Sequence, residues 1–327
     1  MHGVKRKQWT QELLKQKRIQ DQRKIASYRE LVDEVLKLRD DGCFTNESLK
    51  ATTRLLQANP EFNAIWNYRR EIVDRLAPSL DSGFWNDELM FTLVLLKQYP
   101  KVYWIWNHRI WTLQHHSDRT TTVWENELAM VSKLLQLDAR NFHGWHYRRL
   151  ILNKLEKLTS RNRDADELQY VTQNINKDIS NYSAWHQRAS LISSLFDNHE
   201  IADERKFILD EFAYITNAIF TDAEDQSVWF YTKWFIKYVN VSKVLGHGEY
   251  IRQLQDLKSN IIAINQDDVE FSGKENNWCL KILIFIEGIE QELGLQIESH
   301  SEAYLKQLII ADPLRKNRYL SLIAKRT

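Results

Sequence analysis

The chain has 327 residues, with 45 Lys and Arg against 44 Asp and Glu, and its formal net charge of +1 does not favour nucleic acid as a partner. Only 9 Gly and 4 Pro occur, and helix-forming residues are abundant, which predicts an all-α protein. Cys43 and Cys279 stand far apart with no Cys/His cluster near them. We therefore expect no thiolate zinc site in this chain.

The sequence shows no sign of a membrane segment. Residues 1–24 are polar and basic, unlike a secretory signal. The longest apolar stretch, residues 282–286, is far too short to span a bilayer. We expect a cytoplasmic protein with no transmembrane segment.

The N-terminal segment is strongly basic. Residues 1–25 carry eight Lys and Arg against Glu12 and Asp21, within a helix expected from about Trp9 to Arg39. Such a run is typical of a solvated helix face, and contact with an acidic partner is the alternative. We divide the chain into this basic extension and first helix, residues 1–40, and a repeat array, residues 41–327.

Tryptophan recurs at a nearly constant interval in the array. The intervals between Trp66, Trp106, Trp145, Trp185 and Trp229 are 40, 39, 40 and 44 residues. The first four have an arginine three positions later, namely Arg69, Arg109, Arg148 and Arg188. A period of this size indicates a repeat array, in which each repeat packs on its neighbours. Such an array can reach this length without a linker that separates domains.

Each repeat is predicted to be a helical hairpin. In the second repeat, Asn86 is expected to cap a helix that ends at Tyr99-Pro100, because proline disfavours helical geometry in the residue before it. A second helix then begins near Lys101 and carries Trp106. The pattern predicts about six to seven hairpins, whose successive second helices hold Trp66, Trp106, Trp145, Trp185, Trp229 and Trp278.

The Trp and Arg of each repeat are interpreted as structural residues. A buried indole fills the gap between adjacent hairpins and removes about 150–250 Å² from water. An arginine one turn later can bind a neighbouring carboxylate or the free carbonyls of the preceding helix. We do not expect these residues in an active site.

The repeats resemble those of the α subunits of heterodimeric protein prenyltransferases, which read as a helix, a proline or asparagine turn, and W-x-x-R. Residues 59–70 and 141–149 match this pattern closely. The resemblance implies a right-handed superhelix of stacked helical hairpins, an α–α solenoid crescent that curls around a β subunit in an obligate heterodimer.

Within that family the chain looks most like the type II, or Rab, geranylgeranyltransferase α subunits, on the basis of Met1-His2-Gly3 before the basic helix and Asn-Pro-Glu-Phe at residues 59–62. This implies an enzyme subunit that is inactive without its β subunit. The enzyme would transfer geranylgeranyl from geranylgeranyl diphosphate to C-terminal cysteines of Rab GTPases presented by an escort protein, a step in vesicle transport. Zinc held by the β subunit would activate the cysteine thiolate.

Two alternatives remain open. One is the α subunit shared by farnesyltransferase and type I geranylgeranyltransferase, which performs the same chemistry with a different β subunit and no escort. The other is a non-enzymatic, tetratricopeptide-like scaffold that only binds peptides. Such repeats run near 34 residues, so the interval of about 40 argues against the scaffold.

A diphosphate leaving group needs positive charge close to it. Residues 100–103 (Pro-Lys-Val-Tyr) match the family segment whose lysine contacts the diphosphate, so the resemblance assigns that role to Lys101. A cation there is not required by the repeat, because the corresponding positions hold Glu61, Arg140, Ser180 and Glu224. A solvated or paired surface lysine is the alternative.

Four further residues are carried over from the resemblance. Tyr103 and Trp104 would face the mouth of the β-subunit active site and the tail of the protein substrate, unless they only pack in the subunit interface. Phe142 matches a position where related α subunits place an aromatic near the diphosphate, although it lacks a hydroxyl. His2 could make a transient contact with the β-subunit zinc.

Overall fold

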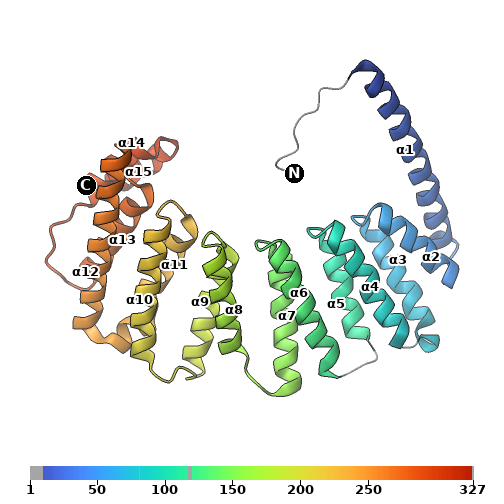
Figure 1. The fold of residues 1–327 in the computed structure, drawn as a ribbon, viewed down its shortest axis with the longest axis horizontal. Coiled ribbons are helices and arrows are strands. Elements are labelled where there is room, and N and C mark those ends of the chain that lie inside the picture. Colours follow the sequence, from blue (N-terminus) through green and yellow to red (C-terminus); the bar gives the residue numbers. More distant parts are fainter. Residues whose placement is uncertain (1–9, 81, 117–119, 326–327) are drawn as a thin grey trace. The chain divides into compact units, whose positions relative to one another are not determined.

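The computed structural model describes residues 10–80, 82–116 and 120–325, and these form helices and turns with no β-strand (Figure 1). They divide into two compact units, Met1–Thr159 and Ser160–Thr327. Helices pack as successive hairpins within each unit. The predicted all-α class and hairpin repeat are therefore confirmed.

In the first unit, a long helix is followed by three hairpins. The elements are α1 (Gln11–Asp40), α2 (Asn46–Ala58), α3 (Asn63–Leu76), η1 (Ala77–Ser79), α4 (Ser82–Gln98), α5 (Tyr103–His115), α6 (Thr121–Leu137) and α7 (Phe142–Thr159). The hairpins are α2–α3, α4–α5 and α6–α7, and their second helices α3, α5 and α7 pack in a row.

The second unit continues the same arrangement. Its elements are α8 (Asp164–Lys177), α9 (Tyr182–Asp197), α10 (Glu204–Thr221), α11 (Gln226–Lys237), α12 (Val239–Ser272), α13 (Asn277–Glu292), α14 (Ser301–Ala311), η2 (Pro313–Arg315) and α15 (Lys316–Ala324). The second helices α9, α11 and α13 again pack side by side, and α14 and α15 cover the last hairpin. α12 bends at Gly246, whose φ of 71° is accessible to glycine without steric cost.

Helix boundaries follow the capping chemistry in some repeats and tertiary packing in others. Thr45 and Ser48 form a reciprocal capping box at the start of α2. The expectation that Asn86 caps the next helix was wrong, because α4 begins earlier, at Ser82. The extra turn buries Trp85, and burial of a large aromatic outweighs a local capping preference.

The repeated tryptophans hold the turn that precedes their own helix. Each indole Nε1 donates to the carbonyl oxygen six residues earlier, at 2.7–2.9 Å: Trp66 to Pro60, Trp106 to Pro100, Trp145 to Ala139, Trp185 to Ile179 and Trp229 to Ala223. The side chains are almost fully buried. The predicted structural role of these five residues is confirmed.

Trp278 does not continue this series. It lies in α13 but is only partly buried. Asn276 caps α13, and the residue four positions later, which is tryptophan after Asn141 and Asn181, is here the fully buried Leu280. The sixth repeat thus fills its core with a smaller side chain.

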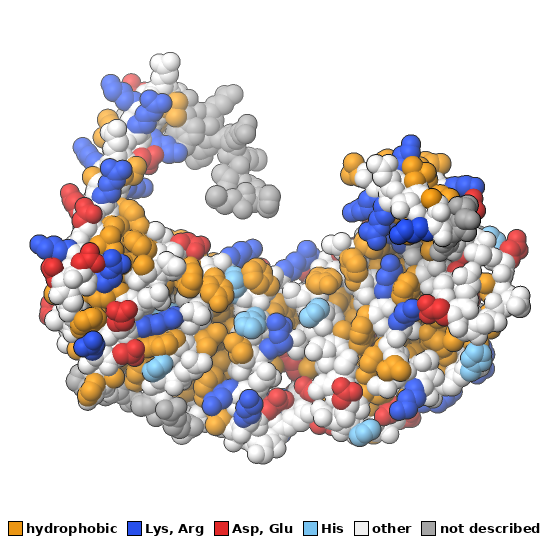
Figure 2. All heavy atoms as spheres, turned by 180° about the vertical axis from the view of Figure 1, so that it is seen from behind, with side chains coloured by type: hydrophobic (Ala, Val, Ile, Leu, Met, Phe, Trp, Pro, Cys, Tyr) orange, Lys and Arg blue, Asp and Glu red, His pale blue; other side chains and the backbone are white. Residues whose placement is uncertain are grey.

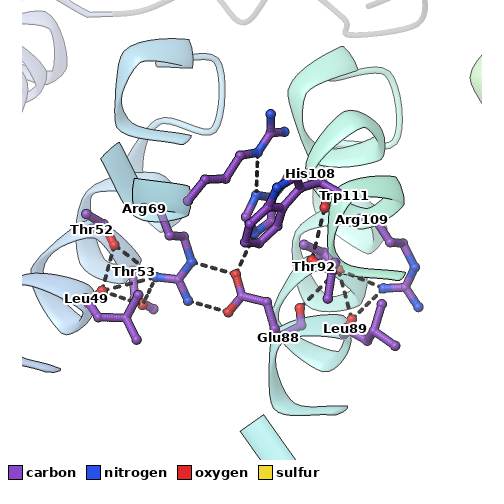
Figure 3. A network of polar contacts seen from close by, with 12 residues as sticks. Leu49, Thr52, Thr53, Arg69, Glu88, Leu89, Thr92, His108, Arg109 and Trp111 are labelled. Atoms are coloured by element: carbon purple, nitrogen blue, oxygen red, sulfur yellow. Dashed lines mark hydrogen bonds and ion pairs between the residues drawn. The ribbon is translucent and has the colours of Figure 1, made fainter. Parts of the chain in front are cut away.

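The repeated arginines join consecutive hairpins (Figure 3). Arg69 lies on α3 and donates through Nε and Nη2 to the two carboxylate oxygens of Glu88 on α4, at 2.7 and 2.6 Å. Its Nη1 donates to the Leu49 carbonyl oxygen of α2, at 3.1 Å. Equivalent bidentate pairs are Arg109–Glu127 and Arg188–Glu211.

Candidate functional site

The lysine expected to touch diphosphate lies at an exposed turn of the first unit. Lys101 is two residues before α5, slightly outside the first helical turn where we expected it. Its side chain is 73% exposed, and Nζ lies 3.6 Å from Asp138 Oδ2 at the end of α6. Exposed pairs of this kind contribute about 0–1 kcal/mol, so the ammonium group is available to a stronger anion.

Buried donors fix the backbone of this turn. The Pro100 carbonyl oxygen accepts from Trp106 Nε1 and from Asn141 Nδ2, both at 2.9 Å. The Asn141 side chain also accepts from the backbone N–H groups of His143 and Gly144, at the start of α7. One asparagine therefore links the turn that carries Lys101 to the next hairpin.

Aromatic rings form a row beside Lys101. The Tyr103 ring lies edge-on to Trp104 at 5.2 Å and 6.0 Å from His143, and Phe142 lies 4.0 Å from His143. Tyr103 and Phe142 are exposed, and Trp104 is half-buried. The structure therefore brings Lys101, Tyr103, Trp104 and Phe142 together at the starts of α5 and α7.

His143 belongs to this site, although the sequence did not single it out. Burial lowers the pKa of His143 from 6.5, against an opposing hydrogen bond to the Lys101 backbone. The nearby His146 adds to the lowering. A neutral His143 next to Lys101 adds a polar ring without a second positive charge at neutral pH.

A second cation, Arg70, lies near the row of rings. Its Nη2 donates to Asn107 Oδ1 at 2.6 Å, and its Nε donates to His108 Nδ1 at 3.2 Å. Burial lowers the pKa of Arg70, while Asp74 and Tyr103 act in the opposite direction. The sequence offered a signal for it, because the first repeat reads Trp-x-x-Arg-Arg and the next has Ile110 at the second arginine position.

A buried network supports α5 from the side of α3 and α4 (Figure 3). His108 Nε2 lies 2.6 Å from Glu88 Oε1, and Glu88 also binds Arg69. Since Arg70 Nε–H points at Nδ1, that nitrogen must accept and Nε2 must donate. Desolvation lowers the pKa of His108 to about 4, so it is neutral at pH 7.

The described residues contain no group of three or more His, Cys, Asp and Glu side chains that could hold a metal ion. No helix among them is long and apolar enough to cross a membrane. His2 lies outside the residues that the structure describes, so its proposed contact with zinc is not assigned a place here.

Comparison with known proteins agrees with the repeat geometry. The family model of the protein prenyltransferase alpha subunit repeat matches residues 45–76, 85–116, 124–155 and 164–195. A chain in the solved structure of Candida albicans protein geranylgeranyltransferase-I complexed with GGPP superposes with a TM-score of 0.67, covering 92% of this chain and 91% of that chain. At 22% identity, this match supports the fold alone. The fold and repeats define the class: a protein prenyltransferase α subunit.

Relatives that match nearly the whole chain identify its family within this class. The geranylgeranyl transferase type-2 subunit alpha of Saccharomyces cerevisiae is 56% identical over 99% of both chains. That of Candida albicans is 36% identical, over 99% of this chain and 97% of the relative. The chain belongs to the family of geranylgeranyl transferase type-2 α subunits. An α subunit of this kind implies a β subunit as partner.

Proposed function

We propose that this chain is the α subunit of a heterodimeric Rab geranylgeranyltransferase. The enzyme transfers geranylgeranyl from geranylgeranyl diphosphate to C-terminal cysteines of Rab GTPases that an escort protein presents. The similarity to type-2 α subunits over nearly the whole chain supports the activity. The main observation that supports a role for this chain in catalysis is the exposed, weakly paired ammonium group of Lys101 beside a row of aromatic rings.

Lys101 acts on the leaving group. In prenyl transfer, a bond forms between the cysteine sulfur and the terminal prenyl carbon, and the bond from that carbon to a diphosphate oxygen breaks. Negative charge therefore grows on the diphosphate. An ammonium group beside the diphosphate stabilises this charge more in the transition state than in the ground state, which lowers the barrier.

The aromatic residues contact the organic parts of the substrates. Tyr103 and Trp104 present ring faces and edges next to Lys101, and Phe142 extends the same apolar surface. Such a surface suits a prenyl chain or the tail of a protein substrate. Packing against the β subunit is the alternative role for Tyr103 and Trp104.

Zinc in this proposal is held by the β subunit, where it would activate the cysteine thiolate. The described residues of this chain include no group of three or more side chains that could hold it. His2 remains a proposed transient contact to that zinc. Replacing His2 with alanine tests it through the zinc affinity of the heterodimer, and an unchanged affinity removes the idea.

The role of Lys101 is tested by Lys101→Ala in the assembled heterodimer. Loss of one charged contact to the developing anion should lower the rate about 10²–10³-fold, with the heterodimer still formed. Lys97→Ala removes an exposed lysine from the last turn of α4 and is the matched control. A normal rate for Lys101→Ala at both limiting and saturating lipid would show that the assignment is wrong.

A reconstitution experiment separates the proposal from its main alternative. The chain is co-expressed with the β subunit of type II geranylgeranyltransferase or with that of farnesyltransferase, and prenyl transfer is measured with and without escort protein. We expect escort-dependent transfer to a Rab protein with the first β subunit only. Transfer to a substrate without an escort, in a complex with the farnesyltransferase β subunit, would favour the alternative.

A further inference from the structure

The first half of α1 extends beyond the helix on which α1 packs (Figure 1). α1 has 30 residues, and α2 beside it has only 13. Asn59, just after α2, donates through Nδ2 to the Tyr28 hydroxyl at 2.7 Å, and every residue from 11 to 27 is exposed. Because a short helix is only marginally stable in water without tertiary packing, this half of α1 would be stabilised by a partner.

The face of α1 that packs on α2 changes character where α2 ends. Along α2 this face is apolar, with Val35 fully buried and Tyr28 partly buried. At the same spacing of three and four residues, the face continues toward the N-terminus with one leucine, two lysines and an aspartate. These residues are Leu14, Lys17, Asp21 and Lys24. We call them, with Leu13 and Ile25 on either side, the basic face of α1.

Positive charge predominates on this half of the helix. Residues 10–27 hold five Lys and Arg against Glu12 and Asp21. Figure 2 shows Lys and Arg side chains along this part of the chain. Within the described residues, Arg18 and Lys24 form no ion pair, whereas Arg54 of α2 pairs with Glu34 farther along α1 at 2.6 Å.

An open groove of about 670 Å³ lies where the two parts of this face meet. Ile25, Tyr28 and Leu31 of α1 line it together with Ala58, the last residue of α2, and Lys24 adds a cation. The Ile25 side chain is 51% exposed. An apolar side chain from a helix that lies along α1 can therefore pack here, directly beside a lysine.

The arrangement favours a protein helix over other occupants. A lipid surface binds helices whose apolar and charged residues lie on opposite faces, whereas Lys17 and Lys24 lie between Leu13 and Ile25 on one face. A second copy of this chain would bring like charges together. The core of an obligate subunit interface is depleted of charged residues, so this face also does not suit a permanent contact with the β subunit.

We propose that the basic face of α1 binds an acidic amphipathic helix of a further protein, which joins the assembled heterodimer reversibly. The helix lies along α1 beyond the end of α2. Its carboxylates pair with Lys17 and Lys24, and its apolar side chains pack against Leu14, Ile25 and the groove. Helices associate in this way when a narrow apolar seam is flanked by complementary charges. Because charge contributes much of the attraction, the affinity falls as salt rises.

The test measures binding of a fluorescein-labelled acidic helix to the co-expressed heterodimer by fluorescence anisotropy. The probe is a peptide of three Leu-Glu-Ala-Leu-Glu-Glu-Glu repeats, which places the leucines in one stripe. The reference peptide has the same composition in an order without an apolar stripe. We expect at least 10-fold tighter binding of the probe. Amide hydrogen exchange in residues 11–27 should become slower when the probe is bound.

Variants on the same helix assign the binding to this face. The double variant Lys17→Glu, Lys24→Glu should lower the affinity for the probe at least 10-fold. The control Lys15→Glu, Arg29→Glu makes the same change in charge at exposed positions on the other side of α1 and should have less than a 3-fold effect. Ile25→Ser leaves the charge unchanged and should weaken binding, because it removes an apolar contact.

Three outcomes would overturn the proposal. The first is that the probe does not bind the heterodimer, which is also the result expected if the β subunit covers α1. The second is that both peptides bind equally, that both charge variants lose equal affinity, or that Ile25→Ser has no effect, any of which would show non-specific attraction. The third is that vesicles of phosphatidylserine and phosphatidylcholine displace the probe, which would indicate a site for a lipid surface.

Discussion

At the scale of single residues, His108 shows how the array stabilises a charged interior. It meets Glu88 from α4 through Nε2 and Arg70 from α3 through Nδ1, and Arg69 lies on the other side of the same carboxylate. A proton added to His108 would place an N–H donor against the Arg70 donor. The neutral form is therefore part of the folded structure.

The network predicts loss of stability at mildly acidic pH. The folded-state pKa of His108, about 4, lies below its ordinary value of 6.5. As pH falls through this window the unfolded chain binds a proton that the folded chain excludes, so stability falls, by about 3 kcal/mol in the limit. The measurement is the urea midpoint between pH 7 and pH 4.

Two variants check this prediction. His108→Gln removes the titrating group and should flatten the dependence of the urea midpoint between pH 6.5 and pH 4.5. Below that range Glu88, whose pKa is also held low by Arg69 and His108, continues to lower stability in both proteins. His186→Gln, at an exposed site, is the control. An unchanged slope in His108→Gln would count against the neutral buried imidazole.

At the scale of helices, the sequence predicted the hairpins from the interval of Trp and Arg but not the partners of those residues. The repeat register did mark the carboxylates, because Glu88, Glu127 and Glu211 each lie 18 residues before the Trp of their own hairpin, but the sequence pattern was read only for Trp and Arg. The prediction that Asn86 caps a helix was wrong because the burial of Trp85 extends α4 toward its N-terminus. Trp278 lies in the predicted second helix, but the cap at Asn276 places Leu280, and not Trp278, at the core position of the other tryptophans.

The same distinction predicts unequal costs for two tryptophan substitutions. Trp145→Ala removes a fully buried indole that also binds the Ala139 carbonyl oxygen, and should lower the free energy of unfolding by about 3–5 kcal/mol. Trp278→Ala, at a partly buried position, should cost about 1–2 kcal/mol. Urea unfolding of both variants is the measurement, and equal costs would contradict the assignment of Leu280 to the core.

For the candidate site, the sequence and family pattern named four of the residues that the structure brings together. Lys101 and the rings of Tyr103, Trp104 and Phe142 follow from local motifs. Asn141, His143 and Arg70 do not, because their roles depend on contacts between hairpins roughly one repeat apart. Periodicity in a sequence shows which residues share a helix face, but not which side chains meet across two repeats.

At the scale of the molecule, the Arg–Glu pairs make neighbouring hairpins within each unit depend on one another. Glu127 accepts from Arg109 of the preceding hairpin and from the Tyr147 hydroxyl of its own, at 2.5 Å. Glu211 has the same arrangement with Arg188 and Tyr231. Stability in such an array is mostly a sum over repeats and the interfaces between neighbours.

Because neighbouring hairpins depend on each other, we expect a substitution to destabilise mainly the hairpins next to it. Glu127→Gln leaves Arg109 buried without its anion, which should cost about 3–5 kcal/mol. Amide hydrogen exchange should then rise in α4–α7 with little change in α10–α13. Glu211→Gln should produce the opposite distribution. A uniform rise across both units in either variant would show that the array unfolds as one cooperative body.

The indole bond to the carbonyl six residues earlier has a consequence for how such chains tolerate length change. The intervals between repeats vary from 39 to 44 residues, yet the segment spanned by this bond never lengthens or shortens in the five repeats that have it. The longest interval takes up its extra residues in the linker between α9 and α10 and at the start of α10, which has 18 residues against 14 in α8. That junction is the natural place to splice in an affinity tag or a fluorescent reporter, whereas one residue added between Ala139 and Trp145 would pull an indole off its acceptor.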